Sequence, residues 1–227
     1  MKQLLKYDIT LQWRQGFWLV YFIVSVAFVV ILFNIPQTHR LPVTIYILLS
    51  DTSILGITFV GALILLEKQQ NVLHSLFVTP LSIRNYLISK TTSLTLLITF
   101  MCLLILLPVN SPGWHFIPIL CATILSSIIF TLLGLGISSQ ANTINQYLGR
   151  MIGFSIFIPV PVIPFIMFDN FKWLIIFPIN AALDIMLNVI DGTATALIYI
   201  DLIILIFWTF IAYYFAYNEF KKHVLNN

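Results

Sequence analysis

Two acidic side chains stand inside otherwise apolar stretches of this sequence, and they are the residues best placed to do chemistry. Asp51 and Asp201 each lie about two turns inside such a stretch, which corresponds to a depth of about 10 Å. A carboxylate in apolar surroundings costs several kcal/mol unless it is paired, protonated or hydrated. The two residues therefore indicate either a polar vestibule that meets a substrate or two packing groups held by neighbouring hydroxyls. Ser50, Thr52 and Ser53 offer such hydroxyls beside Asp51.

The patterns that usually carry catalysis are missing from the sequence. It contains no GxxxxGK loop for nucleotide phosphates, no HExxH and no GxSxG. The histidines fall in predicted loops or at the ends of apolar runs: His39, His74, His115 and His223. Neither Cys102 nor Cys121 has a CxxC partner, so both are expected to be small buried side chains. We therefore expect no enzyme activity, no metal site and no ATP site in this chain.

The composition identifies the solvent in which these residues must be positioned. Of 227 residues, 60% are hydrophobic and 8% are charged, and the mean hydropathy is +1.01. Soluble domains carry about 25% charged residues. So few charges predict a membrane protein, and this length accommodates six helices of about 20 residues with short loops.

Six apolar runs define the predicted spans of an all-α membrane protein. They cover residues 17–33, 44–66, 85–107, 116–137, 149–168 and 193–217. Pro36 and Pro42 are expected to break the chain between the first two spans. Three prolines in the fifth span predict a kink or a break in its second half: Pro159, Pro161 and Pro164.

Two further segments are apolar without being spans. Residues 1–15 place Leu5, Ile9 and Trp13 at helical spacing among basic residues, which predicts an amphipathic helix lying in the membrane interface. Residues 169–192 are interrupted by Pro178 and Asp184, and neither half is long enough to span. We expect two short helices that enter and leave one leaflet, a re-entrant segment.

The distribution of basic residues predicts the orientation. With six spans and a cytoplasmic N-terminus, two of the 11 Lys and Arg residues fall outside, Arg40 and Lys172. The other nine fall inside: Lys2, Lys6, Arg14, Lys68, Arg84, Lys90, Arg150, Lys221 and Lys222. The positive-inside rule therefore predicts that both termini are cytoplasmic.

The longest polar interruption between spans, residues 67–82, lies on the cytoplasmic side of this arrangement. Its apolar residues share one face of a helix: Val72, Leu73, Leu76 and Phe77. Its polar residues lie largely on the other faces: Glu67, Lys68, Gln70, Asn71 and His74. Pro80 ends the helix. The pattern predicts a short amphipathic helix at the membrane surface, either an ordinary loop on lipid or a lever that a partner grips.

Gly149 and Gly153 form a GxxxG pattern at the start of the fifth span. Such a pattern lets two helices approach closely, and it is compatible with packing inside one chain or with a dimer contact.

The stretch from the end of the second span into the third resembles the ABC-2 type permeases of ATP-binding-cassette exporters, and leans toward small bacterial drug or peptide exporters. The matching positions are Glu67, Leu73, Leu76, Thr79, Pro80, Arg84 and Tyr86. The layout is similar elsewhere, with an N-terminal elbow helix at 1–15, six spans and a re-entrant segment at 169–192. The chain departs from many members at Asn71, where they have glycine, and it has no large extracellular domain.

This resemblance implies a single transmembrane domain over residues 1–227 in a bacterial cell membrane. It implies a coupling helix at 67–82 that contacts an ATP-binding subunit through Glu67, Lys68, Leu73, Leu76, Phe77, Thr79, Pro80 and Arg84. ATP and Mg would bind that subunit, and a second permease, identical or paralogous, would complete the transporter. The substrate would be a hydrophobic or amphipathic drug, peptide or lipid moved out of the cell.

Two other functions remain open from the residues alone. A non-transport membrane protein for immunity or interaction would need no ATPase. An ion-coupled carrier would use Asp51 and Asp201, although such carriers usually show internal repeats and charges at the bilayer midplane, and neither feature is evident here.

Overall fold

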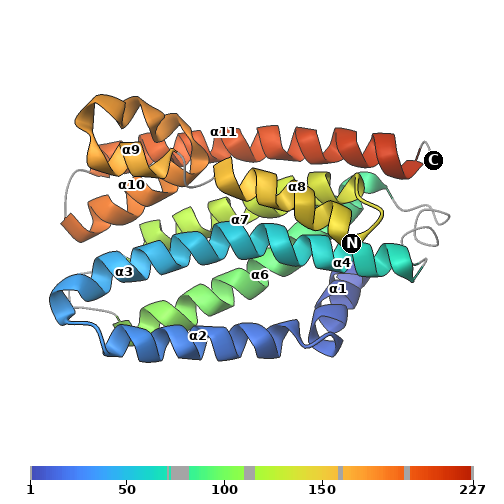
Figure 1. The fold of residues 1–227 in the computed structure, drawn as a ribbon, viewed down its shortest axis with the longest axis horizontal. Helices are drawn as coiled ribbons and strands as arrows, with labels where there is room; N and C mark the ends of the chain where they lie inside the picture. The colour runs from blue at the N-terminus through green and yellow to red at the C-terminus, as the bar shows by residue number, and fades with distance from the viewer. Residues whose placement is uncertain are drawn as a thin grey trace.

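The computed structural model describes residues 2–70, 72, 82–109, 116–157, 161–191 and 195–225, and within them it contains helices and no strand. The first elements in chain order are α1 (Lys2–Arg14), α2 (Phe17–Phe33), α3 (Gln37–Ser50), the π-helical turn η1 (Asp51–Leu55), α4 (Gly56–Gln69) and α6 (Ile83–Val109). Next come α7 (Phe116–Ser139), α8 (Ile144–Phe157), α9 (Val162–Met167), the 3₁₀ helix η2 (Asp169–Ile176), α10 (Pro178–Asp191), α11 (Thr195–Phe220) and η3 (Lys221–Leu225). The long helices run side by side, and α1 crosses one end of them (Figure 1).

Four helices of the described chain are long and apolar enough to cross a membrane: Gln37–Gln69, Ile83–Val109, Ile117–Ser139 and Ile198–His223. Two bent pairs raise the number to six if each counts as one span. One pair joins α1 to α2 at 63°, and the other joins residues 170–176 to 178–189 at 109°. The number of predicted spans therefore lies at the upper limit of this range, but the stretch predicted as the fifth span is not among these candidates.

The loop predicted between the first two spans is shorter than expected. Pro36 precedes α3 as the predicted break, whereas Pro42 lies inside α3, so the prediction that Pro42 also breaks the chain is wrong. A proline removes one hydrogen bond to the carbonyl four residues earlier. That carbonyl belongs to Thr38, which is exposed near the start of the helix and can bond elsewhere, so the helix continues.

The proline-rich stretch predicted as the fifth span is divided into α8 and α9. These helices have 14 and 6 residues, and residues 158–160 between them lie outside the described part. The predicted interruption in the second half of this stretch therefore agrees with the helix boundaries.

The bend between η2 and α10 is stabilised by a buried amide. Asn180 Nδ2 donates to the carbonyls of Leu174, at 2.9 Å, and Pro161, at 3.0 Å. Trp208 of α11 donates from Nε1 to the Ile176 carbonyl at 2.7 Å. The carbonyls of Leu174 and Ile176 at the bend are thus satisfied by side-chain donors of the protein. A re-entrant position of this segment in the membrane stays a prediction.

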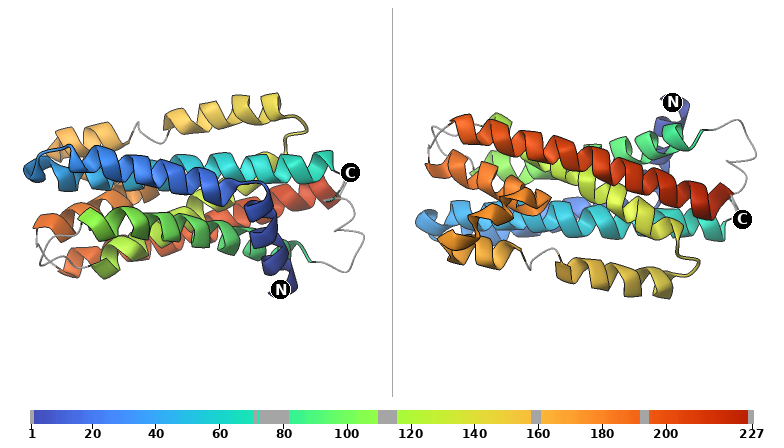
Figure 2. Two further views of the ribbon diagram at one scale, coloured as in Figure 1. Left: turned by 90° about the horizontal axis from the view of Figure 1, so that it is seen from below. Right: turned by 90° about the horizontal axis from the view of Figure 1, so that it is seen from above.

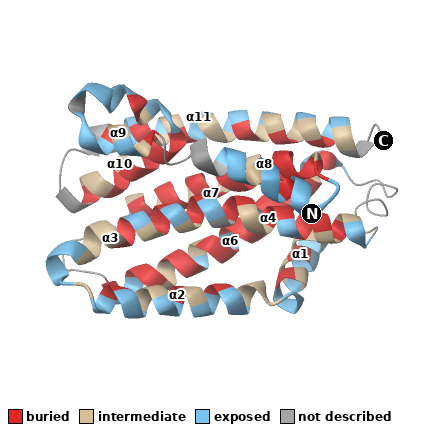
Figure 3. Cartoon of the chain, viewed as in Figure 1, coloured by how far each residue is buried: buried red, intermediate tan, exposed pale blue. Residues whose placement is uncertain are grey.

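The centre of the bundle is α7, which packs against α4, α6, α10 and α11. Its buried residues include small and hydroxyl-bearing side chains, among them Ala122, Ser126 and Thr131. Gly134 lets α4 approach closely, because a Cβ there would lie 2.4 Å from Val60 Cγ1. Figure 3 shows burial concentrated on the inner helices, while α2 and α11 carry many exposed residues. Large apolar side chains on those two helices, such as Phe22 and Phe210, face outward as lipid contacts would.

The helix α8 lies on the outside of α4 and α7, separate from the main row of helices in both views of Figure 2. It is docked by Tyr147, which is buried and whose hydroxyl donates to the Ile57 carbonyl. The ring fills the space above Gly61, where a Cβ would lie 1.9 Å from Tyr147 Cζ. Gly149 and Gly153 differ, since a Cβ on either would meet no atom of the described residues within 4 Å.

This contrast gives a test of how α8 is held. We expect Gly61→Ala to destabilise the protein by about 1–3 kcal/mol, because the added methyl displaces the Tyr147 ring. The matched Gly149→Ala is expected to leave stability unchanged or raise it slightly, because alanine favours exposed helix positions. Unfolding of both variants in detergent measures the difference, and equal effects would contradict the docking of Tyr147 on Gly61.

Candidate functional site: a buried charge network at one end of the bundle

Four elements meet at the end of the bundle that carries the chain segment between α4 and α6. The last turn of α4 and the first turns of α6 lie next to each other, and α1 crosses α6 there (Figures 1 and 2). The end of α11 joins them, because the ring of Phe220 packs on that of Tyr86 with centroids 5.5 Å apart. Both flanks of the predicted coupling segment are therefore anchored in the same place.

The anchor is a buried lysine between two buried carboxylates from different helices. Lys90 of α6 lies 2.7 Å from Oδ1 of Asp8 in α1, and its ammonium also pairs with Oε1 of Glu67 in α4. Each of the three residues is 1% exposed. At such burial a lone charge is costly, so neither the ammonium nor the carboxylates can be buried here without an opposite charge.

Neutral donors complete this arrangement, which we call the Lys90 network: Asp8, Gln12, Glu67, Tyr86, Ser89, Lys90 and Ser93. The Tyr86 hydroxyl donates to Glu67 Oε2 at 2.6 Å, and the Ser89 hydroxyl donates to Asp8 Oδ2 at 2.5 Å. Gln12 donates from Nε2 to the Ser93 hydroxyl oxygen at 2.9 Å. Two carboxylates thus share one ammonium, and their remaining oxygens accept from hydroxyl groups.

The helix α1 uses its polar face to join the bundle. Asp8 and Gln12 are one turn apart and are buried against α6, whereas Trp13 is 69% exposed. The apolar side of an amphipathic helix would pack inward in a soluble protein. Here the bundle receives Asp8 and Gln12 together with Leu11, while Leu5 and Ile9 are half-buried and Trp13 is exposed. An interfacial position of α1 stays a prediction.

Lys68 follows Glu67 directly and binds a different element. Its ammonium donates to the carbonyls of Ser139 and Ala141, both at 2.7 Å, and of Ser138 at 3.3 Å. The last carbonyls of a helix have no partner within it, and a cation there is favourable. The end of α4 is therefore fixed to the end of α7.

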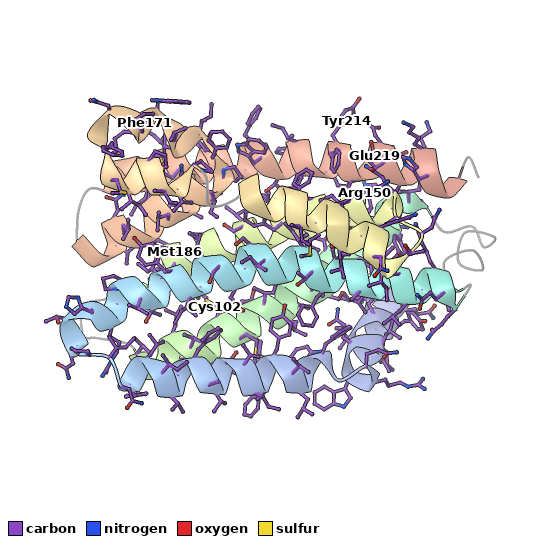
Figure 4. All side chains as sticks on the ribbon, viewed as in Figure 1. Cys102, Arg150, Phe171, Met186, Tyr214 and Glu219 are labelled. Carbon is purple, nitrogen blue, oxygen red and sulfur yellow. The ribbon has the colours of Figure 1, made fainter. Side chains whose placement is uncertain are left out.

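A polar bridge also connects α8 to α11 at this end. Gln140 donates to Glu219 Oε2 at 2.8 Å and accepts from Arg150 at 3.2 Å. Arg150 and Glu219, labelled in Figure 4, lie near each other on these two helices.

The predicted coupling residues are only partly within the described chain. Glu67 and Lys68 are buried and half-buried, and Arg84 is exposed on the first turn of α6. The remainder lie outside the described residues: Leu73, Leu76, Phe77, Thr79 and Pro80. Their contact with a partner stays a prediction.

Asp51 and Asp201 have different neighbours. Asp51 opens the π-helical turn η1 and interacts electrostatically with Tyr21 and Cys102. Asp201 is buried on α11 beside Asp184 of α10, whose Oδ2 accepts from Asn188 Nδ2 at 2.7 Å. π-helical turns frequently occur at functional sites, but a common vestibule for the two carboxylates stays a prediction.

Among the described residues, no three His, Cys, Asp or Glu side chains are placed to hold a metal ion.

Sequence reasoning missed Asp8 and Lys90 as site residues. Lys90 lies only five residues inside the third predicted span, so it counts as a boundary charge in an orientation argument. Asp8 is the only acidic residue in a basic N-terminal segment. The missed signal was the combination of Lys90, whose ammonium lies inside an apolar run, with the carboxylates of Asp8 and Glu67, which lie outside the apolar runs.

These features define a multi-pass α-helical membrane protein with a buried charge network at one end of its bundle. The chain belongs to the fluoroquinolones export permease protein family, whose model matches residues 1–227, and this confirms the expected ABC-2 type permease. Proteins named fluoroquinolones export permease, from two strains of Mycobacterium tuberculosis, are each 28% identical over 160 residues. The match covers 70% of this chain and 68% of each relative. The family is one of export permeases, which are transport subunits rather than catalysts.

The Lys90 network predicts strong dependence of stability on its only cation. We expect Lys90→Met to destabilise the protein by about 3–5 kcal/mol, because two carboxylates remain buried without a counter-charge. Adding Asp8→Asn and Glu67→Gln to this variant should restore much of the loss, since no net charge is then buried. Unfolding in detergent measures both, with the exposed Lys221→Met as a control. A triple variant no more stable than Lys90→Met would contradict charge compensation.

Proposed function

We propose that this chain is the membrane-spanning subunit of an exporter driven by ATP hydrolysis on a separate subunit. Family membership supports a permease of an exporter. The sequence has no phosphate-binding GxxxxGK loop, so in this proposal the energy source is a separate subunit. ATP and Mg would bind the partner.

The observation that carries this proposal is the connection between the two flanks of residues 67–82. Glu67, in the last turn of α4, is the first residue of the segment and is bound by Tyr86 and Lys90 of α6, the helix that follows it. Asp8 adds α1 to the same ammonium. A force applied to the segment by a partner would therefore move α1, α4 and α6 together rather than bend one helix.

In this proposal, residues 67–82 form the coupling helix. Closure of the ATP-binding subunits would shift it, and the Lys90 network would transmit the displacement to the spans. The chain would form one transmembrane domain over residues 1–227 in the bacterial cell membrane, with α1 as an interfacial elbow, η2 and α10 as a re-entrant segment, and both termini in the cytoplasm.

A second permease copy or a paralogue would complete the translocation path. The open face of α8 around Gly149 and Gly153 is a candidate contact, because no described residue fills the space above these glycines. The substrate would be an amphipathic or hydrophobic molecule. The Mycobacterium tuberculosis relatives are named for fluoroquinolones, so these drugs are the first candidates to test.

The coupling helix can be tested by capture of the ATPase. We expect Leu76→Asp to reduce co-purification of the ATP-binding subunit at least tenfold, because a charge enters an apolar contact of about 1.5 kcal/mol or more. Leu76→Met keeps the apolar volume and serves as the matched control. If the ATPase binds Leu76→Asp as well as it binds Leu76→Met, residues 67–82 are not the coupling helix.

The two membrane-embedded aspartates give a separate prediction. If they meet substrate, Asp51→Asn and Asp201→Asn should lower ATP-dependent drug efflux several-fold while the amount of folded protein remains the same. Efflux from inverted vesicles and gel filtration of the purified variants measure the two quantities. A fall in folded protein without a change in efflux per molecule would assign both residues to packing.

A further inference from the structure

A groove of about 760 Å³ lies between α6 and α11, with α7 as its floor. One wall is a row of threonines on α6, Thr91, Thr95 and Thr99, spaced one turn apart. The opposite wall is Phe210 and Tyr213 of α11, and the floor is aliphatic. The volume falls in the range of about 300–1,000 Å³ that is typical of ligand sites. Because α8 packs on α4 and α7, the groove is separate from the proposed dimer face.

The groove has a basic end. Arg84 contributes to its lining, is exposed, and has no acidic partner among the described residues. Lys221 and Lys222 are exposed at the same end of the bundle, because they follow Phe220, whose ring packs on Tyr86. The acidic residue near them, Glu219, already accepts from Gln140 and pairs with His223 at 3.3 Å.

The length of the groove matches one leaflet of a membrane. From Arg84 to Thr99 the wall on α6 measures about 22 Å at 1.5 Å per residue. A bilayer is about 40–45 Å thick including headgroups, so one leaflet is about 20–22 Å. A phospholipid that places its phosphate at Arg84 would extend its acyl chain along the threonine row toward Thr99.

We propose that this groove is a binding site for an acidic phospholipid, with the headgroup at Arg84 and one acyl chain between α6 and α11. The charge of the site selects this occupant. Basic pockets between spanning helices attract anionic headgroups. A second copy of this chain would bring another basic end against the first, because copies related by a two-fold axis along the membrane normal place like ends together. This site does not depend on the proposed transport function and requires no ATPase for its detection.

Native mass spectrometry of the purified full-length chain can test the site. The protein is titrated with phosphatidylglycerol or phosphatidylcholine, and the binding of the first lipid is compared. The wild type should bind phosphatidylglycerol more tightly than phosphatidylcholine. Arg84→Ala should weaken phosphatidylglycerol about fivefold, the loss expected for one basic residue near an anionic lipid, whereas Arg84→Lys should keep the preference. Arg150→Ala removes an exposed arginine of α8 outside the groove and should have no effect.

A second variant tests the acyl-chain part. Thr92 lines the groove and is exposed, so Thr92→Trp should fill the space and weaken both lipids. Ile203→Trp on the exposed side of α11, outside the groove, is the matched control. Equal binding of both lipids by the wild type, or equal losses in Arg84→Ala and Arg150→Ala, would overturn the proposal. So would a fluoroquinolone that displaces phosphatidylglycerol and itself requires Arg84, since the groove would then be a drug site.

Discussion

The burial of one ammonium between two carboxylates is the constraint on which this end of the bundle depends. Lys90 cannot remain charged at 1% exposure without a carboxylate partner, and neither acid could be buried there without the ammonium. Three helices distant in the sequence are thereby held in one arrangement. The contacts also specify register, because a shift of α1 by one residue would remove both Asp8 and Gln12 from α6.

Elsewhere the bundle is held by other means. Lipid is as apolar as leucine, so burial of apolar surface does not drive spanning helices together. The helices are held together instead by close packing at small residues, as at Gly134 against Val60, and by hydroxyl groups along α7. The apolar side chains that a soluble protein would bury are exposed on α2 and α11, which is consistent with a membrane protein of this family.

The sequence alone predicted the class of fold, the ends of several helices and the family. The first predicted span coincides with α2, because a run of 17 residues that are apolar except for Ser25 has only one placement in a bilayer. Sequence failed where the outcome depends on distant partners. Pro42 is tolerated because Thr38 is exposed at the start of a helix, and Gly61 is needed because Tyr147, more than eighty positions away, lies on it. The Lys90 network is similar, since its members come from three separate segments.

The charges in the Lys90 network indicate which of its helices contributes the less essential contact. With two carboxylates and one ammonium, the site has an excess negative charge that Tyr86 and Ser89 disperse by donating hydrogen bonds. Glu67 receives both the ammonium and the phenol, and loss of Asp8 would leave a balanced pair of Glu67 and Lys90. Loss of Glu67 would instead leave Lys90 tied to α1 alone and would separate α4 from α6. The contact of Glu67 in α4 with Lys90 and Tyr86 in α6 is therefore the main connection between the flanks of residues 67–82. The helix α1 is a third helix, which binds this pair through its polar face.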